Sequence, residues 1–271
     1  MPRYKITIEY LGKGLIGWQK QNSENQESSL ISVQSILQDA FYKLTQEKPE
    51  LIVAGRTDAG VNAFGQVVHF DLEKNFKAFN IQEGLNVYLM NSPVSVKKAE
   101  IVSDDFNARF SANKRHYRYI ILNQRTPSIL MKDRAWHIKK PLDIEAMRQA
   151  SEYLIGRHDF SSFRSTQCQA KNPVRKIEEI RISQSSQMPI WANKIEDKNF
   201  CEQFSDNLIF IDISAKSFLH HQVRNIVGTL KDIGFKKYPP EKMQEILEAK
   251  DRTKAGETAP ACGLYFVGVE Y

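Results

Sequence analysis

Cysteine is scarce in this chain of 271 residues, which contains only Cys168, Cys201 and Cys262. An odd number of widely spaced cysteines excludes a disulfide framework, and the sequence has no CxxC pair that would indicate zinc. We therefore expect reduced thiols in a reducing compartment, and no metal site.

Long apolar stretches are also absent. Because no run of about 18 apolar residues occurs, no membrane-spanning helix is expected. The N-terminal residues enter a strand pattern directly, without the apolar core of a signal peptide. The expected location is therefore the cytoplasm, with no membrane partner.

Nucleotide-binding fingerprints are missing as well. The glycine-rich segment 10–19 lacks the lysine and hydroxyl that close a phosphate loop. Its glycine spacing does not match a dinucleotide fingerprint, and no helical pattern follows it at once. The absence of both motifs argues against a nucleotide cofactor.

Basic charge is what the chain has in excess, with a formal net charge of +6. Lysine and arginine gain affinity for polyanions by releasing phosphate counterions. The charge favours an acidic partner such as RNA or DNA, although many basic proteins bind neither.

Strand and helix periodicities alternate in the same order in both parts of the chain. In the first part, strand alternation at 4–10 is followed by helical spacing over 33–44 and 81–90. In the second part, strand patterns such as 117–122 and 208–215 accompany helical patterns that begin near Asp143 and Leu219. Each part reads strand, helix, strand, strand, helix, strand, which is the order of the ferredoxin-like fold.

This order predicts an α+β protein of two ferredoxin-like halves, 1–105 and 106–271, whose antiparallel sheets join around a central, positively charged cleft. The alternative is two unrelated α+β domains that share an order. The polar segment 184–203 interrupts the second half. We interpret it as a surface loop that is either an idle insertion or a binding arm.

The densest motif is Gly55-Arg56-Thr57-Asp58-Ala59-Gly60-Val61, between two strand patterns. Glycines at both ends allow a tight backbone path and a close approach to a ligand. Asp58 could serve as nucleophile or general base, while Arg56 suits a phosphate. Taken alone, an Asp in this setting is far more often a turn former than a catalyst.

A second cluster, at 106–119, interleaves basic and aromatic residues. Such side chains can pair with phosphates and stack on bases, but the same pattern fits a half-buried strand with a solvated polar face. On a strand, Tyr117 and Tyr119 share one face and Arg118 points to the other.

The third motif, at 218–228, contains His220, His221 and Arg224. If the helix includes both histidines, they point away from each other and do not share a metal. Arg224 lies near the start of this helix, where it is either a surface residue or an anion ligand.

Together, these stretches resemble the TruA-type tRNA pseudouridine synthases. The residues that carry the resemblance are those at 17–19, 55–61, 65–70, 106–112, 117–119 and 220–228. They occur in the family's order and span nearly the whole chain.

The resemblance implies an isomerase that converts uridines 38 to 40 of the tRNA anticodon stem-loop to pseudouridine, without metal or organic cofactor. It implies a homodimer with Asp58 as the catalytic residue. Tyr117 corresponds to the ring that stacks on the target uracil, and Arg224 to the arginine that pairs with the carboxylate. Arg56 corresponds to the arginine that helps extrude the nucleotide.

Two positions depart from the family pattern, because Leu11 stands where Asp is usual and Asn62 where His is usual. Neither is a core catalytic position, and we expect differences in RNA contacts at the rim of the cleft. Two other functions compete with the isomerase: an inactive RNA-binding relative, and an N-glycosidase that hydrolyses the same bond.

Overall fold

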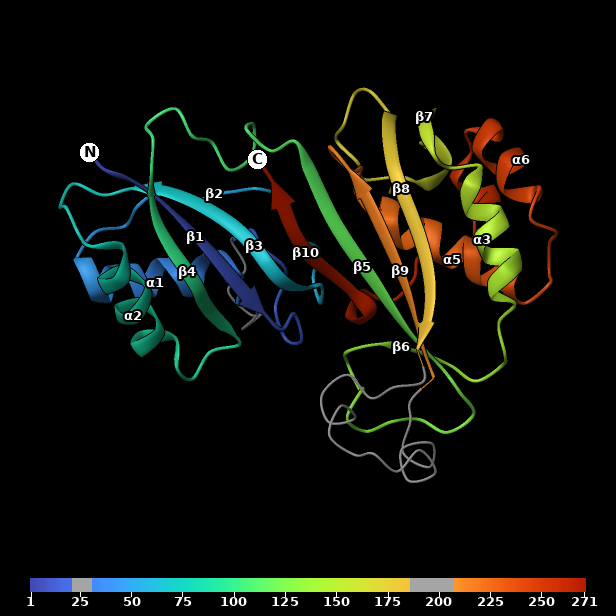
Figure 1. The fold of residues 1–271 in the computed structure, drawn as a ribbon, viewed down its shortest axis with the longest axis horizontal. Coiled ribbons are helices and arrows are strands. Elements are labelled where there is room, and N and C mark those ends of the chain that lie inside the picture. Colours follow the sequence, from blue (N-terminus) through green and yellow to red (C-terminus); the bar gives the residue numbers. More distant parts are fainter. Residues whose placement is uncertain (21–30, 186–206) are drawn as a thin grey trace. The chain divides into compact units, whose positions relative to one another are not determined.

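The computed structural model describes residues 1–20, 31–185 and 207–271 of the chain (Figure 1). Two compact units can be distinguished. The first comprises Met1–His116 together with Tyr265–Tyr271, and the second comprises Tyr117–Leu264.

The first unit is a sheet with two helices on one face. Its elements are β1 (Arg3–Tyr10), α1 (Val33–Thr45), β2 (Ile52–Val53), β3 (Asn62–Asp71), α2 (Ala78–Leu89), β4 (Val94–Val102) and most of β10 (Leu264–Glu270). Strands β4, β1 and β3 are adjacent and antiparallel, and β2 pairs antiparallel with β3. At its other end β3 pairs in parallel with β10, Tyr265 opposite Asn62.

Alternation along β1 determines which face of this sheet is covered. Tyr4, Ile6, Ile8 and Tyr10 are buried, whereas the residues between them are partly exposed. Helix α1 begins after the N-cap Ser32, whose side chain accepts from the backbone of Ser35. Its apolar stripe packs on the sheet, with the Phe41 ring centroid 4.4 Å from that of Phe70 in β3.

The second unit repeats the mixture of sheet and helices. Its elements are most of β5 (Lys114–Asn123), then β6 (Trp136–Ile138), α3 (Ile144–Glu152), β7 (Gly156–Asp159), β8 (Val174–Ser185), β9 (Leu208–Ala215), α5 (Gln222–Gly234) and α6 (Lys242–Ala249). Sheet neighbours follow the order β5, β9, β8, β7, with β6 on β5. Helix α5 is buried along most of its length because α3 packs against it.

The α+β class is as predicted, but the sheets are mixed rather than antiparallel. Strand β10 runs parallel to β3, and β6 runs parallel to β5. The first exception arises because the chain returns at its C-terminus to pair with a strand formed near its N-terminus. The second is a short strand, missed because its three residues are too few to show a period.

The compact units also differ from the predicted halves, 1–105 and 106–271. Residues 106–116 and Tyr265–Tyr271 pack with the first unit. Of the predicted loop at 184–203, Gln184 and Ser185 belong to β8, and residues 186–203 lie outside the described part of the chain. Among the described residues, no helix is long and apolar enough to cross a membrane.

Candidate active site

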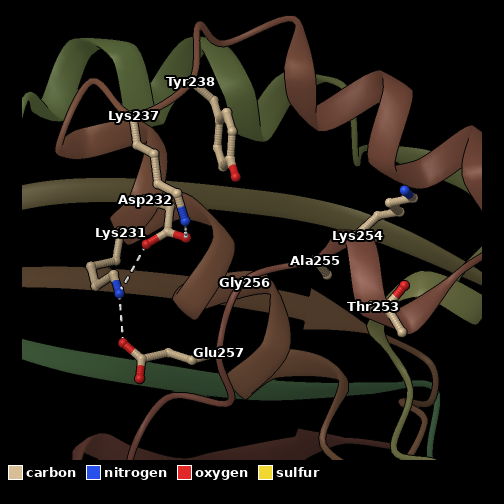
Figure 2. Close-up of a pocket in the computed structure, with 9 residues that line it drawn as sticks. All are labelled: Lys231, Asp232, Lys237, Tyr238, Thr253, Lys254, Ala255, Gly256 and Glu257. Atoms are coloured by element: carbon tan, nitrogen blue, oxygen red, sulfur yellow. Dashed lines mark hydrogen bonds and ion pairs between the residues drawn. The ribbon is translucent and has the colours of Figure 1, made fainter.

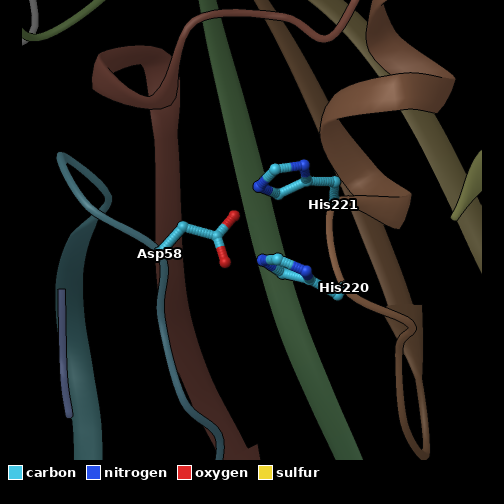
Figure 3. A group of neighbouring side chains, drawn as sticks. All are labelled: Asp58, His220 and His221. Carbon is cyan, nitrogen blue, oxygen red and sulfur yellow. The ribbon is translucent and has the colours of Figure 1, made fainter. Parts of the chain in front are cut away.

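Asp58 lies on the loop that connects β2 to β3, where it is half-buried beside the buried Thr57 (Figure 3). The loop turns at this point, because the backbone N–H of Val61 donates to the carbonyl oxygen of Asp58 at 3.2 Å. Side-chain hydrogen bonds from β1 and β3 hold the loop in place. The hydroxyls of Tyr10 and Thr57 are 2.7 Å apart, and Gln66 Nε2 donates to the carbonyl oxygen of Gly55 at 2.8 Å.

The glycine-rich segment after β1 packs directly on this loop. The N–H of Trp18 donates to the carbonyl oxygen of Thr57 at 3.1 Å. Gly17 has φ +95, and a Cβ there would stand 2.4 Å from the same oxygen. A side chain at Gly12 would likewise meet the carbonyl oxygen of Val61 at 2.3 Å. These glycines therefore allow two backbones to touch, and that contact fixes the Asp58 loop.

Asn62 does not occupy the rim position expected for it. Its side chain is 1% exposed, and its Oδ1 accepts from the N–H of Gly12 at 2.8 Å. The asparagine therefore helps to join the glycine-rich segment to the Asp58 loop. The expected difference in RNA contact does not fit this position, because a buried side chain does not reach a ligand at the surface.

Arg115 is a second support for the loop that sequence reasoning missed. The sequence placed it among basic residues that either pair with phosphates or lie on a solvated strand face, yet it is buried. Nε and Nη2 donate to the carbonyl oxygen of Ala54 at 3.0 and 2.7 Å, and Nη2 also donates to that of Arg109 at 2.6 Å. On a strand, Arg115 lies on the face opposite to that of its neighbours Lys114 and His116. This alternation was the signal in the sequence that could have revealed its burial.

In the second unit, Tyr117 is half-buried on β5, and its ring packs edge-on against Phe218 with centroids 5.1 Å apart. Arg118 points away from it, as predicted, and forms a bidentate ion pair with Asp212 at 2.7 and 2.9 Å. Hydrogen bonding to Asp212 raises the pKa of Arg118. Arg118 thus helps to hold β5 to β9, whereas the ring of Tyr117 contacts Phe218.

The histidine pair differs from the prediction. Helix α5 begins at Gln222, so His220 and His221 precede it, and His221 adopts a left-handed conformation with φ 63. Their ring centroids consequently lie only 4.0 Å apart (Figure 3), instead of pointing away from each other. The apolar pattern from Leu219 onward concealed this turn.

Arg224 is in the first turn of α5 and is held by the segment that follows α6. Its Nε donates to the carbonyl oxygen of Ala259 at 2.7 Å, and the N–H of Ala259 donates back to the carbonyl oxygen of Arg224 at 3.2 Å. Asn225 Oδ1 accepts from Arg252 and from Thr258 at 3.0 and 2.7 Å. Gly228 leaves room for the backbone of Glu257, whose oxygen would lie 1.8 Å from a Cβ.

A pocket of about 340 Å³ lies beside the C-terminal end of α5. Figure 2 shows the residues that line it. Lys231 Nζ lies 2.9 Å from Asp232 Oδ1 and 2.5 Å from Glu257 Oε1. Lys237 Nζ lies 3.2 Å from Asp232 Oδ2. Both carboxylates that line this pocket are therefore paired with lysines, as in an ion cluster that stabilises a helix end.

The predicted site residues are thus distributed over both units. Arg56, exposed, and Asp58 share one loop of the first unit, whereas Tyr117 and Arg224 belong to the second. In each unit, other residues of the motifs form the hydrogen bonds and ion pairs that hold the backbone around the predicted site residues.

Comparison with known proteins gives the family of the chain. The sequence matches the family described as tRNA pseudouridine synthase over residues 6–111 and 150–271. It is 47% identical to tRNA pseudouridine synthase A of Ehrlichia canis (strain Jake), over 99% of this chain and 100% of that protein. The proteins of the same name from Ehrlichia chaffeensis and Wolbachia pipientis wMel are 46% and 45% identical with equal coverage.

Matches of this extent identify the chain as an RNA-modifying isomerase. It belongs to the tRNA pseudouridine synthase family, which confirms the resemblance seen in its motifs. Arg56, Asp58 and Arg224 lie inside the matched stretches, and Tyr117 lies between them.

Proposed function

We propose that this protein converts uridine to pseudouridine at positions 38–40 of the tRNA anticodon stem-loop, with Asp58 as its catalytic carboxylate. The full-length similarity to tRNA pseudouridine synthase A carries the proposal. The tightly held loop supports the role of Asp58, because a catalytic group must be kept within a fraction of an ångström of its working position.

The reaction breaks the N1–C1′ bond, turns the uracil, and forms a C5–C1′ bond, after which C5 releases its proton and N1 gains one. A base inside a helical stack has no room for this rotation, so the nucleotide must be extruded at a cost of a few kcal/mol. Stacking of the uracil on Tyr117 offsets part of this free energy. Arg56 binds the backbone phosphate beside the extruded nucleotide, where a guanidinium can pair bidentately.

Arg224 is assigned the role of electrostatic partner of the carboxylate. A neighbouring cation favours the ionised form of an Asp and orients it. Asp58 then acts at C1′, at the uracil ring or on a sugar proton. Exclusion of water is essential in each route, because water would otherwise capture C1′ and release free uracil.

The proposal extends to the architecture around the reaction. We assign the chain two related ferredoxin-like halves, 1–105 and 106–271, whose bounds in the sequence differ from those of the compact units by the segments 106–116 and 265–271. We also assign it a positively charged RNA-binding cleft, a homodimeric state and a cytoplasmic location. The order β1, α1, β2, β3, α2, β4 in the first unit supports the ferredoxin-like plan of the first half. The net charge of +6 supports a polyanionic substrate.

Tritium release from tRNA labelled at uridine C5 tests the assignment of Asp58. The variant Asp58→Asn keeps the size of the side chain but removes its charge, so turnover is expected to vanish while tRNA binding persists. Asp39→Asn is the matched control, because Asp39 is an exposed carboxylate on α1. Full activity of Asp58→Asn would refute the assignment.

Product analysis separates the competing activities. Pseudouridine in the digested tRNA is the expected product. Free uracil would instead identify a glycosidase, and tRNA binding without any tritium release from the wild type would identify an inactive RNA-binding relative.

A further inference from the structure

The loop between β4 and β5 exposes an aromatic ring that the proposed mechanism does not use. Phe110 is 76% exposed, and the guanidinium carbon of Arg109 lies 5.4 Å from the centroid of its ring. An exposed phenylalanine gains nothing from the hydrophobic effect in the isolated protein. A singly exposed apolar side chain is common on protein surfaces and by itself indicates no ligand, so the inference depends on how this ring is held and what lies over it.

Hydrogen bonds within the turn fix its conformation. Asn107 Oδ1 accepts from the backbone N–H groups of Arg109 and Phe110 at 3.0 and 3.1 Å. The hydroxyl of Ser111 accepts from the N–H of Asn107 at 3.0 Å, and the N–H of Ser111 donates to the carbonyl oxygen of Asn107 at 2.9 Å. Asparagine caps a turn of this kind without a regular helix.

The residues that precede the exposed ring also attach the turn to the sheet of the first unit. Ala108 is fully buried, its N–H donates to His69 Nδ1 at 3.1 Å, and its carbonyl oxygen accepts from the hydroxyl of Tyr271 at 3.0 Å. Arg3 Nη1 donates to the carbonyl oxygen of Phe106 at 3.0 Å. The exposed ring is therefore displayed from an ordered support, and little further ordering entropy is lost when it is covered.

Arg115 connects this turn to the Asp58 loop. One guanidinium donates both to the carbonyl oxygen of Arg109, in the turn, and to that of Ala54, at the base of the Asp58 loop. The two loops thus share one buried cation. A ligand that rests on Phe110 is therefore held at a defined offset from Asp58.

We propose that Arg109 and Phe110 form a stacking site for an unpaired nucleobase of the RNA substrate, with Arg109 also binding an adjacent phosphate. The inference rests on the proposed function for the nature of the substrate. A single aromatic ring covered by a guanidinium suits a nucleobase, since every base has a π-face and a phosphate accompanies it. Asp104 and Asp105 precede the turn, and their charges are offset by Arg3, whose pKa is raised by hydrogen bonding to Asp71 and by those aspartates.

Substitutions at Phe110 test the stacking, with tRNA affinity measured by fluorescence anisotropy on the full-length protein. Phe110→Ala and Phe110→Leu are expected to weaken binding by about 5- to 150-fold, the usual effect of losing one stacked base. Phe110→Tyr keeps the ring face and is expected to keep wild-type affinity. Phe79→Ala is the matched control, because Phe79 is 70% exposed but lies on α2.

Arg109 is tested through salt. Arg109→Gln is expected to reduce the slope of log affinity against log salt concentration by about 1, because one phosphate contact is lost. Arg109→Lys, which keeps the charge, is expected to restore the slope.

Three results would overturn the stacking site. Unchanged affinity in Phe110→Ala removes the contact, and wild-type affinity in Phe110→Leu shows that apolar size, not a ring, is required. If Phe110→Ala differs from the wild type in its mass in solution but not in its tRNA affinity, Phe110 contacts another copy of the chain instead of RNA. Tritium release by the wild type is recorded in parallel, so that failure of the proposed reaction and failure of the stacking site are separate outcomes.

Discussion

Tyr10 shows how much of the Asp58 loop depends on single buried groups. Burial raises the pKa of this tyrosine to about 12, because the phenolate would lose its hydration in the interior. The hydroxyl meets Thr57 Oγ1 at 2.7 Å and lies within 3.5 Å of Gln66 Nε2. A polar group buried in this way is stable only while its partners remain.

Thr57→Val is therefore expected to destabilise the protein by about 1–3 kcal/mol, because it removes an oxygen partner of a buried hydroxyl while keeping the side-chain shape. Urea unfolding measures the loss. Thr57→Ser keeps the oxygen and is the matched control, with a cost below that of the valine variant. Equal stability of the two variants would show that the Tyr10 contact contributes nothing.

At the scale of elements, the β4–β5 loop has a pH-sensitive attachment. His69 accepts from the N–H of Ala108, which requires an unprotonated Nδ1. Burial, and then the charge of Arg3, lower the pKa of His69, while Asp71 and Glu50 oppose this shift. Hydrogen bonding to Arg3 lowers the pKa of Asp71 below 3.8, so Asp71 remains ionised when His69 titrates.

Acidification from pH 7.5 to 5 is expected to weaken the fold through His69. Because its pKa is lower in the folded state, the unfolded chain takes up the proton first, and stability falls as pH drops below about 6.5. The lost hydrogen bond is worth on the order of 1 kcal/mol, or about 2–4 °C in Tm. Thermal unfolding across this pH range measures the change.

The variant His69→Gln isolates this contribution, because glutamine can accept from Ala108 but does not titrate. Its Tm is expected to decline less than that of the wild type between pH 7.5 and 5. Parallel declines in the two proteins would mean that another group is responsible.

The contact between α5 and the segment 255–259 depends on Gly228. Replacing a helical glycine by alanine ordinarily stabilises a helix by about 0.5–1 kcal/mol. Here the new Cβ would stand 1.8 Å from the carbonyl oxygen of Glu257, so Gly228→Ala is expected to cost about 1–3 kcal/mol. Turnover is expected to fall with it, because displacement of this segment also moves Ala259 from Arg224.

Gly268→Ala is the control for this change, because a Cβ at Gly268 has nothing within 4 Å. Urea unfolding and tritium release are measured on both variants. If Gly228→Ala is as stable and active as Gly268→Ala, the close approach to Glu257 contributes nothing to the free energy of unfolding or to turnover.

Periodicity predicted the larger elements well, because β1 and α1 bury one regular face each. It failed where contacts distant in sequence decide the conformation. The left-handed turn at His221 leaves no trace in the hydrophobic pattern, and the parallel pairing of β10 depends on a strand some 200 residues earlier. At the site, the motifs indicated Asp58, whereas the buried roles of Arg115 and Asn62 became evident only from their partners.

At the scale of the whole molecule, the first unit is built from both ends of the chain. Phe266 on β10 is fully buried, and Tyr271 packs on Phe106 with ring centroids 4.8 Å apart. The segment Tyr265–Tyr271 follows the second unit in sequence, but it packs with the first unit. The first unit therefore depends on residues that follow the whole of the second unit in the sequence.

Phe266→Ala is accordingly expected to cost about 3–5 kcal/mol, the usual cost of emptying a buried phenylalanine site. The loss should appear as faster amide hydrogen exchange in β3, where Ala63 is the register partner of Phe266. Val267→Ala, at a position 37% exposed, is the control and should leave exchange nearly unchanged. Faster exchange confined to residues 118–263 would contradict this assignment, because it would place the C-terminal strand energetically in the second unit.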